Sequence, residues 1–83
     1  MTTFWLCFRR DGAFAGVAIV DAGNLAGAAQ IAWERGCNPG GEIVSVELPP
    51  SLQIDPSFRN RLLDRADATR LRDEFQKLMT SLH

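Results

Sequence analysis

The feature that most constrains the fold is the stretch 4-FWLCFRRDGAFAGVAIV-20, in which Asp11-Gly12 separates two apolar runs. This dipeptide is a strong signal for a type I′ hairpin turn, which needs positive φ at both central positions. A two-residue loop here would place Arg10 opposite Ala13 and Phe8 opposite Ala15. The two runs are therefore expected to form an antiparallel hairpin.

This register predicts a hairpin with large side chains on both faces. The first face is expected to carry Phe4, Leu6, Phe8, Ala15, Val17 and Ile19. The second face is expected to carry Thr3, Trp5, Cys7, Arg9, Phe14, Gly16, Ala18 and Val20. Trp5 would then face Ala18, and Arg9 would face Phe14, a pair suited to cation–π stacking.

The middle of the chain predicts a helix followed by a third strand. Asp21 and Asn24 are candidate N-caps for a helix that reaches about Arg35, with Gly36 as its C′ residue. The apolar face of this helix would consist of Leu25, Ala28, Ala29, Ala32 and Trp33. The alternating segment 42-EIVSVEL-48 predicts a strand that Pro49-Pro50 ends.

The C-terminal part predicts two helices. Asp55-Pro56 is typical of a helix start, and apolar residues then recur at Phe58, Leu62 and Ala66. Asp67 is expected to cap a last helix. The apolar face of that helix would contain Leu71, Phe75, Leu78, Met79 and Leu82.

The expected fold is a single α+β domain over residues 1–83, with a β-β-α-β unit at 1–48 and a C-terminal helical extension at 55–83. A helical crossover makes the second and third strands parallel, so the third strand should lie beside the first. This arrangement predicts a three-stranded antiparallel sheet with strand order 2-1-3.

Composition and charge restrict the function. The net charge of −1 weighs against nucleic-acid binding, which favours a basic surplus. No apolar run approaches the length of a membrane span, and no basic region precedes Phe4, so we expect a cytoplasmic protein. Two cysteines, Cys7 and Cys37, are too few for a disulfide scaffold or a structural zinc site, and we expect no role for them.

Residue types that carry catalysis are sparse. The single histidine is His83, so the usual Ser-His-Asp or Cys-His arrangements are not expected. Asp64 and Asp67 are better explained as helix caps than as a carboxylate dyad. The stretch 21-DAGNLAG-27 lacks both the Rossmann spacing and the Walker lysine. We expect no catalytic residue, no metal and no cofactor.

Two arrangements remain open for the second face of the hairpin. The C-terminal helices could cover it, or it could stay free as a docking surface for a copy of the chain or another protein. Arginine outnumbers lysine eight to one, and arginine is enriched in interface hot spots. The candidate partner-binding residues are Trp5, Arg9, Arg10, Phe14 and Ile43.

The segment 13-AFAGVAIVDAGNLAGAAQIAWERGCNPGGEIVSVEL-48 has a hairpin, a glycine/asparagine loop, an alanine-rich helix and a strand. In this plan it resembles small phage-encoded anti-CRISPR proteins that act on type I interference complexes. The resemblance covers about half the chain and transfers no contact residue. It implies a non-enzymatic inhibitor that binds a CRISPR effector subunit and blocks access to target DNA.

The sequence therefore predicts a small protein-binding module. An anti-CRISPR inhibitor is the specific form that the resemblance implies. The alternative is a homodimeric nucleic-acid-associated protein that uses the five arginines between Arg59 and Arg72. Direct readout of DNA by the last helix is not expected, because Asp73 and Glu74 would lie where phosphates should be.

Overall fold

The computed structural model describes the backbone of residues 1–81 and the side chains of residues 1–77. Three residues of the apolar face predicted for the last helix, Leu78, Met79 and Leu82, therefore lie outside the described side chains. His83 also lies outside them. The elements in chain order are β1 (Thr2–Arg10), β2 (Ala13–Ala22), α1 (Leu25–Glu34), β3 (Glu42–Leu48), a 3-10 helix η1 (Pro56–Phe58) and α2 (Arg65–Ser81).

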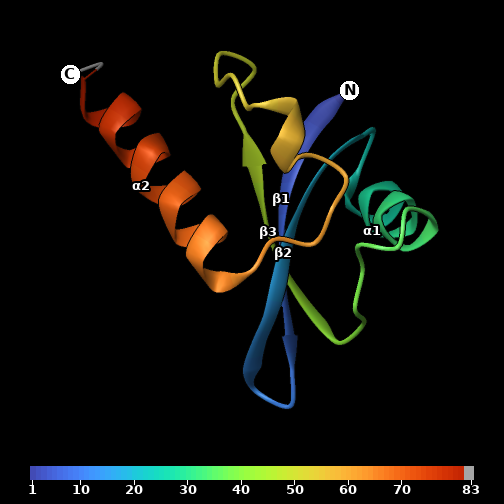
Figure 1. Ribbon diagram of the computed structural model, residues 1–83. Helices are drawn as coiled ribbons and strands as arrows, with labels where there is room; N and C mark the ends of the chain where they lie inside the picture. Colours follow the sequence, from blue (N-terminus) through green and yellow to red (C-terminus); the bar gives the residue numbers. More distant parts are fainter. Residues whose placement is uncertain (82–83) are drawn as a thin grey trace.

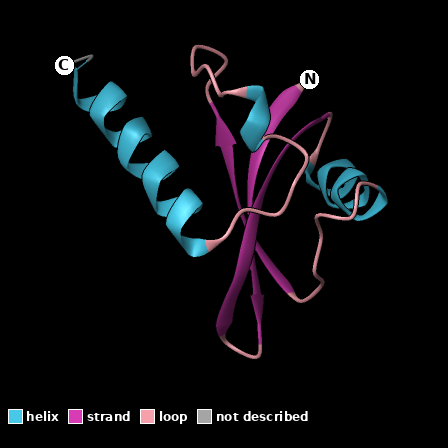
Figure 2. Cartoon of the chain, in the orientation of Figure 1, coloured by secondary structure: helices cyan, strands magenta, loops and turns pink. Residues whose placement is uncertain are grey.

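The three strands form one antiparallel sheet in the order β2-β1-β3, which confirms the predicted topology. The central strand β1 buries Phe4, Leu6 and Phe8. Helix α1 lies on one side of the sheet and α2 on the other, so the domain has three layers (Figures 1 and 2). The protein is thus a small α+β domain.

The hairpin turn follows its sequence signal, but the strand beyond it does not keep the predicted register. Asp11 and Gly12 have φ values of 53° and 78°, and Arg9 faces Phe14 as predicted. A β-bulge then shifts the pairing by one residue, so that Phe8 faces Gly16 and not Ala15.

From that point every residue of β2 points to the face opposite to the predicted one. Trp5 therefore faces Ile19, and the predicted pairing of Trp5 with Ala18 is wrong. The physical reason lies at Gly16, whose φ of 142° suits a bulge and is rarely adopted by other residues. The bulge distributes the apolar residues of β2 between two cores.

The two cores lie on opposite sides of the sheet. The core on the α1 side contains Phe4, Leu6, Phe8, Ala18, Val20, Ala22, Ala28, Ala32 and Cys37. The core on the α2 side contains Val17, Ile19, Leu48, Ile54, Leu63, Ala68, Leu71 and Phe75. Trp5, Cys7 and Phe14 pack at the margin of this second core. The C-terminal segment therefore covers part of the second face.

Helix α1 begins at the second of its two candidate caps. The Asn24 side chain accepts a hydrogen bond from the Gly27 amide at 2.8 Å, whereas Asp21 belongs to β2. Ala28 and Ala32 are fully buried, and small side chains permit a close approach to the sheet. Trp33, expected on this apolar face, is instead 65% exposed.

The first of the two predicted C-terminal helices is much shorter than the sequence indicates. Asp55 caps η1 by accepting from the Ser57 amide at 2.9 Å, but the helix ends at Phe58 and does not reach Ala66. The chain then runs along β2, where the Val17 amide donates to the Leu63 carbonyl at 3.0 Å and the Leu63 amide donates back at 2.7 Å.

The burial of Leu63 explains why this segment pairs with β2 and does not continue the predicted helix. Leu63 is completely buried against the sheet, and Asn60, with a φ of 60°, is incompatible with a continuous helix. Helix α2 consequently begins at Arg65, with Asp64 rather than Asp67 at its start. The Asp64 carboxylate accepts from the Asp67 amide at 2.8 Å.

A polar contact also joins this segment to β2. The Asp21 carboxylate accepts from the Thr3 hydroxyl at 2.5 Å and from Arg59 Nη1 at 2.9 Å. The hydrogen bond from Thr3 and the charge of Arg59 hold the pKa of Asp21 below its ordinary value of 3.8. The ionised form of Asp21 therefore stabilises the folded state.

We expect Gly16→Ala to destabilise the domain by about 1–3 kcal/mol, because the bulge needs positive φ and an added Cβ would overlap Leu62. Gly23→Ala is the matched control, since no atom lies within 4 Å of a Cβ added there. Urea unfolding of both variants measures the difference. Equal stability of the two variants would contradict the role given to the bulge.

We expect Asp21→Asn to reduce the free energy of unfolding by about 0.5–1 kcal/mol at pH 7, a small effect because Asp21 is 47% exposed and solvent screens the pair. Because the pKa of Asp21 is lowered in the folded state, ionised Asp21 stabilises the fold at pH values above the unfolded-state pKa. This stabilisation is lost as the pH falls through the folded-state pKa. The difference from the unmodified protein should therefore shrink below pH 3.8. Urea unfolding across this pH range tests it, and a constant difference would contradict the assignment.

Candidate functional site

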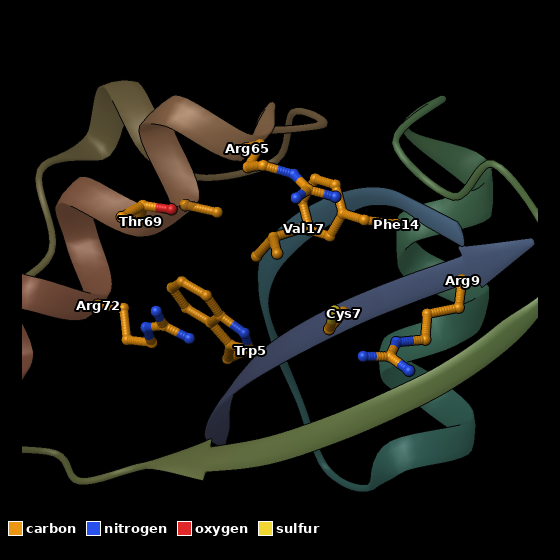
Figure 3. A pocket seen from close by; sticks show the side chains of 9 residues that line it. Trp5, Cys7, Arg9, Phe14, Val17, Arg65, Thr69 and Arg72 are labelled. Atoms are coloured by element: carbon orange, nitrogen blue, oxygen red, sulfur yellow. The ribbon is translucent and has the colours of Figure 1, made fainter. Parts of the chain in front are cut away.

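A groove lies between α2 and the sheet, with lining residues from all three strands. Figure 1 shows that α2 diverges from the sheet toward its C-terminal end, so the helix covers the sheet incompletely. The inner part of the groove is a hollow of about 330 Å³ (Figure 3). Its lining consists of Trp5, Cys7, Arg9, Phe14, Val17, Arg65, Ala68, Thr69 and Arg72.

A second, more apolar hollow of about 260 Å³ adjoins the first and shares Trp5 and Arg72 with it. The other residues of its lining are Val46, Glu47, Leu48, Pro49, Leu52, Phe75 and Gln76. We call the two hollows together the α2 groove.

The floor of the α2 groove is apolar and extends to the edge of the sheet. Trp5 faces Val46 across the strands, and Cys7 faces Val44. The Trp5 ring meets Phe75 of α2 edge to face, with a centroid separation of 5.8 Å and an interplanar angle of 72°. Val44 and Val46 are 53% and 52% exposed, so this floor stays open to solvent beyond Trp5.

Three arginines from two elements surround this floor. Arg65 and Arg72 are seven residues apart on α2, and both line the groove. The Arg65 guanidinium carbon lies 5.2 Å from the centroid of the Phe14 ring, a cation–π contact. In Figure 3, Arg72 extends toward Trp5, and Arg9 of β1 lies beyond Cys7 at the other end of the groove.

None of these three arginines forms an ion pair within the described part of the chain. The ion pairs there join Arg59 to Asp21 at 2.9 Å and Arg61 to Asp67 at 3.7 Å. The arginines of the groove therefore present guanidinium groups that can receive carboxylates from outside. Arginine binds carboxylates through two parallel hydrogen bonds, which gives such contacts a defined geometry.

The structure brings together three of the five predicted partner-binding residues. Trp5, Arg9 and Phe14 line the groove. Ile43 lies apart from them, packed against the core on the α1 side, and Arg10 is exposed at the hairpin end beside Gly41. Neither Ile43 nor Arg10 belongs to the lining of the groove.

The sequence analysis named Arg65 and Arg72 only within the arginine-rich stretch of the alternative function, and it did not single out Val46. The seven-residue spacing of the two arginines places them on one helix face, but the predicted helix start at Asp67 left Arg65 outside the last helix. The predicted stacking partner of Phe14 also changes. Arg9 is its cross-strand neighbour, but Arg65 stacks on the ring.

The two cysteines have different surroundings. Cys37 is buried in the core on the α1 side, and burial raises the pKa of its thiol. Cys7 is half-buried and lines the groove. Among residues 1–77, no three His, Cys, Asp or Glu side chains cluster as a metal site. No helix in the described part of the chain is long and apolar enough to cross a membrane.

Alkylation of the native protein with a small thiol reagent should modify Cys7 well before Cys37, because burial hinders access to Cys37 and disfavours its thiolate. Peptide mass spectrometry over time measures the two rates. Labelling in denaturant should make the rates similar, and Cys7→Ser should lose the early label. Early modification of native Cys37 would contradict its placement in the core.

Comparison of the chain with known proteins assigns it to no family. No protein-family model matches the chain, and neither curated proteins nor solved structures provide a match. The anti-CRISPR resemblance therefore stays a prediction, and function is inferred from the groove.

Proposed function

We propose that this chain is a non-enzymatic protein-binding module, and that the α2 groove holds a partner segment with apolar and acidic side chains. One observation carries the proposal: Arg9, Arg65 and Arg72 surround an apolar floor and have no carboxylate partner in the described part of the chain. Tryptophan and arginine are the residues that most often dominate the energy of protein interfaces.

The groove supplies both parts of such an interface. An aliphatic or aromatic side chain of the partner would pack on Trp5 and Val46, where the floor is open. A carboxylate of the same segment would pair with Arg72 or Arg9, which line the groove. The apolar contact would supply most of the affinity, and the charge pairs would set orientation and specificity.

For the identity of the partner, we propose a subunit of a type I CRISPR effector complex, with the chain acting as an inhibitor that blocks access to target DNA. This proposal rests on the resemblance of segment 13–48. The groove is compatible with it because its residues suit a protein surface that carries carboxylates.

A second candidate is nucleic-acid binding, which the three arginines beside Trp5 favour, since bases stack on aromatic rings and phosphates pair with arginine. The overall charge of −1 and the apolar hollow around Phe75 favour a protein partner. Salt dependence separates the two candidates, because binding to phosphates weakens steeply as salt increases.

Arg72→Glu should weaken partner binding about tenfold or more, because it replaces a groove cation with an anion that repels carboxylates. Arg70→Glu is the matched control, since it makes the same charge change at an exposed position of α2 outside the groove lining. Capture from the native host with each variant, followed by quantitative titration of the retained partner, gives the comparison.

Equal loss of binding in both variants would indicate a nonspecific charge effect and contradict the groove as the binding site. Retention of nucleic acid with a steep salt dependence would select the second candidate.

For the CRISPR proposal, the measurement is target-DNA binding by a purified type I effector complex with and without the protein. Inhibition by the unmodified chain and by Arg70→Glu, but not by Arg72→Glu, is the expected result. An unaffected complex that does not bind the chain would contradict this choice of partner.

A further inference from the structure

The two edge strands of the sheet differ in whether the backbone groups on their outer sides are hydrogen-bonded. The outer edge of β2 is occupied, because Val17 and Leu63 exchange two backbone hydrogen bonds and the Asn60 amide donates to the Ile19 carbonyl at 3.1 Å. The outer edge of β3 has no such cover. Among the described residues, no backbone hydrogen bond joins Glu42–Leu48 to a segment other than β1.

This open edge is only weakly protected, because its two charged residues, Glu42 and Glu47, lie toward the ends of the strand. It contains no lysine, no proline and no bulge between Glu42 and Leu48, and Val44 and Val46 near its centre are about half exposed. Such an edge presents free N–H and C=O groups together with apolar side chains, which suits the addition of another strand.

An antiparallel pair of β3 strands centred on Ser45 matches valine with valine and opposes no like charges. In an antiparallel pair of two copies centred there, Val44 faces the partner's Val46, and Ile43 faces the partner's Glu47. Glu42 then faces the partner's Leu48, so no two carboxylates lie opposite each other. Directly opposite side chains in such a pair lie about 4.5–5.5 Å apart at Cβ, close enough for the valines to pack.

Neighbouring registers are less favourable. A shift by one residue toward the start of the strand places Glu42 opposite the partner's Glu47. A shift by one residue in either direction also reverses the faces, which would put α1 of one copy on the same side of the sheet as α2 of the other. The register centred on Ser45 keeps both α2 helices on one side and pairs all seven residues of β3.

We propose that two copies of this chain form a two-fold symmetric dimer by antiparallel pairing of β3 centred on Ser45. The product is one continuous sheet with strand order β2-β1-β3-β3-β1-β2. Each exposed valine gains a valine neighbour from the other copy, and the two α2 grooves lie on the same side of the sheet with their apolar floors joined. This inference rests on the β3 edge, which shares Val46 with the lining of the α2 groove.

Charge placed at the two valines tests the interface without a change to the buried cores. The double variant Val44→Lys/Val46→Lys would put like charges opposite each other twice in the dimer, and Val44→Glu/Val46→Glu would do the same with the opposite sign. Sedimentation equilibrium should show a dimer for the unmodified chain, monomers for each double variant, and a heterodimer when the two variants are mixed. Circular dichroism checks that each variant is folded.

Three outcomes would overturn the proposal. The unmodified chain could remain monomeric up to high micromolar concentration. Both double variants could remain dimeric, which would place the interface elsewhere. The folded double variants could fail to associate when mixed.

A cysteine pair tests the register separately. The two-fold axis places Ser45 beside the partner's Ser45, so Ser45→Cys should form a disulfide-linked dimer under mild oxidation. Glu47→Cys is the matched control, because Glu47 faces the partner's Ile43 in this register. Both variants carry Cys7→Ser to remove the half-buried native thiol. Equal crosslinking of the two variants would overturn the register centred on Ser45.

Discussion

The backbone conformation of Gly16 is the constraint on which the rest of the domain depends. Its positive φ allows the bulge that separates the two halves of β2, and the shift of one residue decides which side chains face α1 and which face α2. Without the shift, Val17 and Ile19 would point away from the C-terminal segment. With it, they form the part of the sheet on which Leu63 is completely buried.

The position of α2, and so the groove, follows from that burial. Leu63 is held to Val17 by two backbone hydrogen bonds, and Arg59 is held to Asp21 by an ion pair. Helix α2 begins two residues after Leu63 and therefore starts above β2. Because it then diverges from the sheet, the surface over β1 and β3 remains partly open (Figure 1).

The same attachment makes the two sheet edges unequal. The segment that holds α2 occupies the edge of β2, whereas β3 keeps its outer edge free in the described part of the chain. An 83-residue chain buries a smaller fraction of its surface than a larger domain does, so additional burial at a groove or an edge has a large relative effect on its stability. The proposed groove and the proposed dimer both use surface that this small fold leaves exposed.

By itself, the sequence determined the features that depend on local chemistry: the Asp11-Gly12 turn, the boundaries of β3 and the strand order that a helical crossover requires. It narrowed the cap of α1 to Asp21 or Asn24, and the structure selects Asn24. It also placed Trp5, Arg9 and Phe14 together on one face. Tertiary structure alone decided the bulge, the short η1 and the recruitment of Arg65 and Arg72 to that face. The physical reason is that the burial of Leu63 against β2 outweighs the local helical pattern of residues 56–66. This contact joins residues far apart in the sequence, so no local pattern predicts it.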